Sequence, residues 1–66
     1  MDIVLTKHAQ DMMIERGVSM VLLRQALARG SKYKQRSGWL ATYSYVIIAY
    51  HVKRNCYIVK TVMIRK

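Results

Sequence analysis

The sequence predicts an α+β domain, with two short N-terminal helices packed on a three- or four-stranded antiparallel sheet. The chain has 66 residues, the size of a single domain (1–66), and 53% of them are apolar, too many for a disordered basic tail. Apolar residues recur with the period of a helix up to Arg29, and with the period of a strand after Gly30. Helices and strands that follow one another in separate blocks are typical of this class.

The two helices have recognisable start and stop signals. Thr6 is an N-cap residue for a helix over 7–16, and Gly17 suits the left-handed position that ends a helix. Ser19 caps a second helix over 20–29. Each helix carries an apolar stripe, so this αα-hairpin needs a sheet to cover it.

The second half of the chain alternates between apolar and polar residues. In the last strand this alternation puts Lys60 and Thr61 on opposite faces, unless a bulge intervenes. Glycine and asparagine supply the turn signals between the strands. The expected strands are 31–36, 39–43, 45–52 and 56–65, with turns at 37–38 and 53–55 and a short edge strand at 2–5.

The charge is one-sided along the chain. The net charge is +9, and eleven of the twelve Lys and Arg residues lie between Arg16 and Lys66, where there is no acidic residue. Such a segment repels itself, and a polyanion relieves the repulsion, so the partner we expect is RNA or another nucleic acid, or an acidic protein that mimics it. Tyrosine among lysines can also stack on bases. The candidate nucleic-acid-binding residues are Lys32, Tyr33, Lys34, Arg36, Lys53, Arg54 and Lys60.

Several classes of protein are disfavoured. The single Cys56 cannot form an internal disulfide, which fits the cytoplasm, and no Cys/His spacing suits a metal. The longest uncharged run, 37–52, is too short and too polar for a membrane span. Glycines are isolated, so there is no phosphate-binding loop. We therefore expect a cytoplasmic protein without signal peptide, membrane segment, metal or other cofactor.

Three polar residues could carry chemistry. His8 begins the first helix and His51 ends a strand, and histidine both accepts and donates protons near neutral pH. Two histidines with cations could cleave RNA without a metal, one acting as base on the 2′-hydroxyl and one as acid on the leaving oxygen. Arg16 lies eight residues after His8, about 12 Å along a helix axis. Equally, His8 and His51 could be surface residues, and Arg16 a partner of the helix dipole.

The segment from Thr6 to Ser19 resembles the opening of a family of small bacterial proteins, domain of unknown function 4258. Those chains open with a pattern close to Thr-x-His-Ala-x-x-Arg-Met-x-x-Arg-Gly-Ile-Ser, and they end in a strand like Val59-Lys60-Thr61-Val62. The most specific matches are His8-Ala9 and Arg16-Gly17.

The family is similar to the RelE-like and barnase-like ribonuclease toxins. This resemblance implies a fold of two helices on an antiparallel sheet, metal-independent RNA cleavage, and His8, Arg16 and Thr61 as active-site residues. Met12 stands where the family pattern has its first arginine, and a thioether cannot hold a phosphate. Either another base takes that role, or the protein binds RNA without cleaving it.

The sequence thus favours a toxin-like endoribonuclease that binds RNA on a basic face, with an acidic antitoxin as its natural partner. The alternative is a non-catalytic nucleic-acid-binding or regulatory protein of phage or plasmid origin. A third interpretation is a structural protein that docks an acidic partner by a strand edge. So small a chain with an apolar sheet could also form a homodimer.

Overall fold

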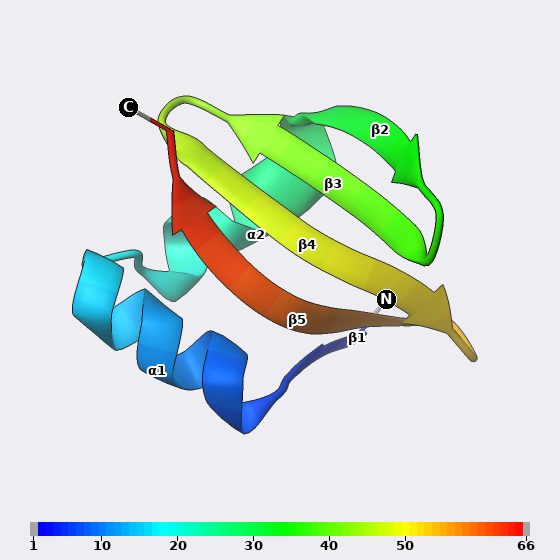
Figure 1. Ribbon diagram of the computed structural model, residues 1–66, viewed down its shortest axis with the longest axis horizontal. Helices are drawn as coiled ribbons and strands as arrows, with labels where there is room; N and C mark the ends of the chain where they lie inside the picture. Colours follow the sequence, from blue (N-terminus) through cyan, green and yellow to red (C-terminus); the bar gives the residue numbers. More distant parts are fainter. Residues whose placement is uncertain (1, 66) are drawn as a thin grey trace.

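The computed structural model describes residues 2–65, which form a five-stranded mixed sheet and two helices (Figure 1). The strand order across the sheet is β1-β5-β4-β3-β2. No helix between residues 2 and 65 is long and apolar enough to cross a bilayer. The elements in chain order are β1 (Asp2–Leu5), α1 (Lys7–Arg16), α2 (Met20–Arg29), β2 (Ser31–Gln35), β3 (Gly38–Tyr43), β4 (Val46–Lys53) and β5 (Cys56–Ile64).

The α+β class is confirmed, but the sheet is larger than three or four antiparallel strands and is not wholly antiparallel. The short N-terminal strand β1 precedes the helices and pairs in parallel with β5, Asp2 beside Cys56 and Leu5 beside Val59. This pairing joins the two ends of the chain. No local turn signal can announce it, because hairpin signals mark only strands that are neighbours in sequence.

Both helices begin and end as their sequence signals predict. The Thr6 hydroxyl accepts a hydrogen bond from the Ala9 amide, and the Ser19 hydroxyl accepts one from the Leu22 amide. Gly17 adopts the left-handed conformation, with φ of 69°, that ends α1. These caps satisfy amides that would otherwise lack a partner inside the helix.

The helices cover one face of the sheet and form the core with it. Ala9 of α1 and Leu23 of α2 are fully buried, as are Ile48 and Val62 of the sheet. Figure 1 shows α2 behind β3 and β4, whereas α1 lies beyond the edge of β5. We call the covered side the helix face and the other side the open face.

Strand register assigns each side chain to a face, because residues directly opposite one another point the same way. The buried pair Ala41 and Ile48 lies on the helix face. The neighbouring pair Leu40 and Ala49 is therefore on the open face. By the same alternation, the open face carries Tyr33, Leu40, Thr42, Ile47, Ala49, His51, Ile58, Thr61 and Met63.

A bulge in β5 changes the predicted alternation. Ala49 is opposite Thr61 and Tyr50 is opposite Val59, so Lys60 is an extra residue without a counterpart on β4. The bulge that the sequence analysis named as the exception is therefore present, and Val59 is on the helix face while Thr61 is on the open face. A bulge lets two successive side chains project to the same side, and Lys60 joins Thr61 there.

Two turns lie together at one end of the sheet, which we call the hairpin end. Arg36-Ser37 connects β2 to β3, and Arg54-Asn55 connects β4 to β5. Because β3 and β4 are antiparallel, the start of β3 lies beside the end of β4. Arg54 and Asn55 have φ of 52° and 63°, the backbone of a tight two-residue hairpin turn. Arg36 and Arg54, two of the predicted nucleic-acid-binding residues, lie at this end.

Candidate functional site on the open face

The site is centred on a contact between the first helix and the last strand. His8, in the first turn of α1, places Nε2 3.0 Å from the Thr61 hydroxyl oxygen. His8 is exposed and Thr61 is half-buried. A threonine hydroxyl can donate to a ring nitrogen or accept from one, so Thr61 can hold the imidazole in either protonation state.

Thr6 fixes the start of α1 to the bulge. Its amide donates to the Val59 carbonyl (3.2 Å), and its hydroxyl donates to the Lys60 carbonyl (3.2 Å) while capping the helix. One residue therefore sets both the direction of α1 and its position against β5. His8, two residues later, is held beside Thr61 as a consequence.

Lys60 crosses the open face towards the hairpin end. Its ammonium donates to the Ser37 carbonyl at 3.1 Å. It also lies 3.4 Å from the point where a Cβ on Gly38 would be, and the His51 Cβ lies 3.5 Å from the same point. A side chain at Gly38 would in addition come within 2.7 Å of the Tyr50 carbonyl oxygen. The glycine therefore leaves open a space that is bordered by the Lys60 ammonium and the His51 Cβ.

The groups are spread over three neighbouring strands of the open face: His8 meets Thr61 at β5, His51 lies on β4, and the Lys60 ammonium reaches the start of β3. An ammonium has three donors, and only one of those on Lys60 is used by Ser37. The open face thus carries two imidazoles, which can transfer protons, and one fixed ammonium, which can bind a phosphate.

The predicted site residues are only partly brought together. His8 and Thr61 are in contact, and His51 shares the open face with them. Arg16 is the last residue of α1, so about 12 Å of helix separates it from His8. The nucleic-acid contacts divide in the same way: Tyr33, Lys53 and Lys60 belong to the open face, Lys32 and Lys34 to the helix face, and Arg36 and Arg54 to the hairpin end.

Between residues 2 and 65, no cation of the sheet pairs with a carboxylate. Within residues 2–65 the one ion pair joins Lys7 to Asp11 (3.6 Å), both exposed and both on α1. The Lys32 and Lys60 ammonium groups bond to backbone carbonyls instead. In the same part of the chain, no three His, Cys, Asp or Glu side chains gather in one place. The positive charge of the sheet is therefore not compensated by ion pairs within the described part of the chain.

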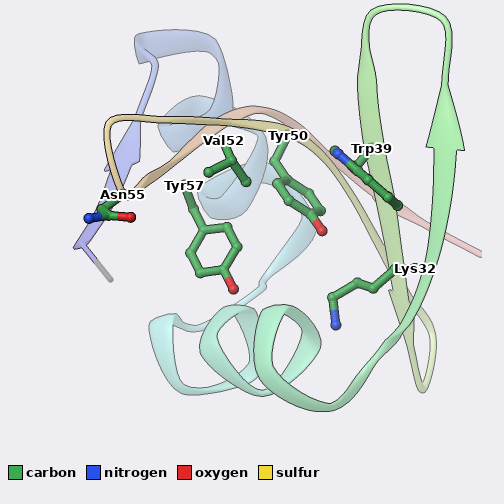
Figure 2. A pocket seen from close by; sticks show the side chains of 6 residues that line it. All are labelled: Lys32, Trp39, Tyr50, Val52, Asn55 and Tyr57. Atoms are coloured by element: carbon green, nitrogen blue, oxygen red, sulfur yellow. The ribbon is translucent and has the colours of Figure 1, made fainter.

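The helix face contains a second feature that the sequence reasoning did not identify. A pocket of about 520 Å³ lies at the hairpin end between the sheet and α2 (Figure 2). We call it the aromatic pocket. Its lining residues are Lys32, Trp39, Tyr50, Val52, Asn55 and Tyr57. The aromatic content of the strands was visible in the sequence, but which rings share a face depends on register and on the bulge.

Two tyrosines form one wall of the aromatic pocket. The rings of Tyr50 and Tyr57 meet edge to face, with centroids 5.4 Å apart and planes at 75°. Burial, and to a lesser extent the neighbouring Tyr57, raises the pKa of Tyr50 above its usual value. The Tyr50 phenol therefore stays protonated, and a hydrogen-bond donor, throughout the physiological range.

The geometry defines a two-layer α+β protein whose basic open sheet face bears a His–Thr pair beside a bulged lysine. The chain belongs to the family described as Domain of unknown function (DUF4258), whose model matches residues 5–64. The match extends from the last residue of β1 to the last residue of β5. No curated protein and no solved structure matches the chain.

Proposed function

We propose that this protein is a small, toxin-like endoribonuclease that cleaves RNA on the open face without a metal ion. The observation that supports this most directly is the His8–Thr61 contact, which holds an exposed imidazole at the edge of the face that also carries the Lys60 ammonium. The likeness to RelE-like and barnase-like toxins is part of this proposal.

In the proposed reaction, one imidazole removes the proton from a ribose 2′-hydroxyl, and the resulting oxyanion attacks the adjacent phosphorus. The bond from phosphorus to the 5′-oxygen breaks, and a second proton donor neutralises that leaving oxygen. His8 and His51 are assigned these two roles. Positioned acid and base groups of this kind contribute about 10²- to 10⁴-fold each.

Lys60 is assigned to the phosphate. The bulge turns its side chain to the same face as Thr61, and the Ser37 carbonyl holds the ammonium in place. A fixed cation stabilises the charge that develops on the phosphate oxygens more than it stabilises the ground state. Lys60 thereby supplies the phosphate contact that Met12, at the position of the family arginine, cannot make.

A second candidate function is nucleic-acid binding without cleavage. It is favoured by the position of Arg16, which ends α1 far from His8 and so does not join the group around Lys60. In either case an acidic protein is the partner we propose for the uncompensated cations, as an antitoxin that covers the open face.

The test is cleavage of a labelled single-stranded RNA by the purified protein in the presence of a chelator. We expect His8→Ala to lower the rate by about 10²-fold or more. Gln10→Ala is the matched control, since Gln10 is also exposed on α1 but is not near Thr61, and it should retain the rate.

Equal cleavage by wild type and His8→Ala would reject the catalytic assignment. Binding that weakens steeply with salt, without any cleavage, would instead establish the second candidate function.

A further inference from the structure

The aromatic pocket on the helix face is not used by the proposed cleavage reaction. Its volume of about 520 Å³ is within the range of small-ligand sites, roughly 300 to 1,000 Å³. Its walls come from β3, β4 and β5, and Lys32 of β2 closes one side. Such a pocket, mostly aromatic with a few polar groups, is suited to a flat, partly polar ligand.

The polar groups of the pocket are directed at the same space. Figure 2 shows the rings of Tyr50 and Tyr57 projecting from the sheet towards α2, with Lys32 extending into the space beside them. Within residues 2–65, neither phenol hydroxyl makes a hydrogen bond to another residue. The Lys32 ammonium uses one of its three donors on the Gly30 carbonyl, at 2.9 Å. Two hydroxyls and an ammonium are therefore ready to bind acceptor atoms of a ligand.

The charge around the pocket selects an anion. Lys34 places its ammonium 5.1 Å from the centroid of the Trp39 ring, on the strand that also carries Lys32. Arg54, in the hairpin turn next to Asn55, adds a third cation at the same end of the sheet. A nucleotide is one ligand that combines a flat ring with acceptor atoms and a neighbouring negative charge.

The pocket and the open face lie on two sides of the same end of the sheet. Trp39 and Tyr50, which line the pocket, are the immediate neighbours in sequence of Gly38 and His51 on the open face, and the Lys60 ammonium lies beside Gly38. One sheet thickness thus separates them, and the hairpin end between them carries Arg36 and Arg54. A nucleic-acid strand that crosses this end would reach both.

We propose that the aromatic pocket binds an unpaired nucleobase of the same nucleic-acid strand that lies across the open face. The base lies against Trp39 and Tyr57, its acceptor atoms bond to the Tyr50 hydroxyl and to Lys32, and the adjoining phosphates meet Lys34 and Arg54. The inference rests on the proposed function in taking nucleic acid as the ligand. It adds a contact to the base itself, where the open face contacts only phosphate and ribose.

The experiment uses single-stranded DNA, which lacks the 2′-hydroxyl and so can bind without being cleaved. The intact protein is titrated with a short oligodeoxyadenylate and with an abasic oligomer of equal length and charge. Trp39 is the chain's single tryptophan, so its fluorescence reports on the pocket directly. We expect the oligomer with bases to bind about tenfold or more tightly than the abasic one, because each stacked base contributes to affinity.

Two variants test whether this difference in affinity arises in the aromatic pocket. Tyr57→Leu should reduce binding of the oligodeoxyadenylate to the level of the abasic oligomer and leave the latter unchanged. Tyr45→Leu is the matched control, because Tyr45 is 45% exposed in the turn at the opposite end of the sheet. Its affinity for both oligomers should equal that of the wild type.

Equal affinity of the wild type for the two oligomers would overturn the inference. Saturation by adenosine monophosphate, with no gain for the oligomer, would assign the pocket to a free nucleotide and overturn the part that concerns a strand. A change in Trp39 fluorescence with an acidic peptide, but not with any nucleotide, would also overturn it. The proposed function is tested separately, because His8→Ala should abolish cleavage and keep the preference for bases.

Discussion

The open face and the helix face of this sheet carry charge of one sign but offer different chemistry. On the open face, His8, Thr61 and Lys60 present groups that move protons or hold a phosphate. On the helix face, Trp39 and Tyr57 present rings to a pocket. The comparison shows how a strand separates side chains that are adjacent in sequence, since alternate residues of β2 serve different surfaces.

The two regions also differ in what creates them. The open-face site depends on an insertion: without the extra residue in β5, Lys60 and Thr61 would face opposite sides. The aromatic pocket depends on a gap in coverage, because α2 packs on β3 and β4 but leaves a space over the rings at the hairpin end. The open-face site is therefore created by the backbone of β5, and the aromatic pocket is created by the way α2 packs on the sheet.

The largest effect that separates the two regions is expected from removing the bulged lysine. Lys60→Met should lower RNA cleavage by about 10²- to 10³-fold, the usual loss when one fixed donor to a developing negative charge is removed. The preference for base-bearing over abasic oligomers should persist, because Lys60 does not line the pocket. The measurement is single-turnover cleavage together with the Trp39 titration.

Arg24→Gln is the control for the loss of charge alone, since Arg24 is an exposed base on α2. It should reduce binding slightly at low salt and leave single-turnover cleavage unchanged. If both variants lose cleavage to the same extent, the effect is due to net charge, and the open face has no special role.

The parts of this fold that the sequence predicted are those set by local chemistry. The caps at Thr6 and Ser19 and the left-handed Gly17 depend on the few residues around them, and all three are confirmed. The strands after Gly30 followed from alternation, which each strand carries in its own sequence. Their boundaries differ by one or two residues from those expected.

The parts that could not be predicted depend on contacts between distant residues. The parallel pairing of β1 joins residues 2–5 to residues 56–59, and a four-residue strand has too little pattern to specify its neighbour. The bulge shifts the face of every residue after Lys60 relative to those before it. Alternation along β5 was therefore predicted correctly, but residues on either side of Lys60 were assigned to the same face when they lie on opposite faces. For the same reason, the sequence identified individual residues of the candidate site but not their arrangement, and it did not identify the aromatic pocket.

The second prediction concerns Gly38, which lies beside the Lys60 ammonium and directly precedes Trp39 of the aromatic pocket. Gly38 has φ of 155°, and a Cβ there would lie 2.7 Å from the Tyr50 carbonyl oxygen. Gly38→Ala should therefore lower the free energy of unfolding by about 3 kcal/mol, from backbone strain and overpacking together. It should weaken both cleavage and base binding, because it displaces the turn beside Lys60 and Trp39. Denaturant unfolding measures the first effect, and the two activity assays measure the others.

Gly17→Ala is the matched control for the glycine. Gly17 also has a positive φ, 69°, but a Cβ there meets nothing within 4 Å. The expected loss is about 1 to 2 kcal/mol, the usual cost of a left-handed alanine. Neither cleavage nor base binding should change at a temperature where the variant is folded. Loss of only one activity in Gly38→Ala would show that the hairpin end does not connect the two regions.

The smallest predicted effect is a difference in cleavage between variants of the two helix caps. Thr6→Ala and Ser19→Ala each remove one hydroxyl that accepts a hydrogen bond from a helix amide, at a cost of about 1 kcal/mol. Thermal unfolding should report the larger loss for Thr6→Ala, because its hydroxyl also donates to the Lys60 carbonyl. Their activities should differ, because only the Thr6 hydroxyl also donates to the Lys60 carbonyl.

Removing that hydroxyl leaves the bond from the Thr6 amide to the Val59 carbonyl as the remaining hydrogen bond between residue 6 and β5, so His8 is held less firmly beside Thr61. Cleavage should fall by several fold in Thr6→Ala and be unchanged in Ser19→Ala, with base binding unaffected in both. A reaction that depends on proton transfer is sensitive to such small displacements, whereas a pocket formed by other strands is not. Equal cleavage by the two variants would mean that α1 needs no anchor at Lys60, and that His8 acts without the geometry described for the open face.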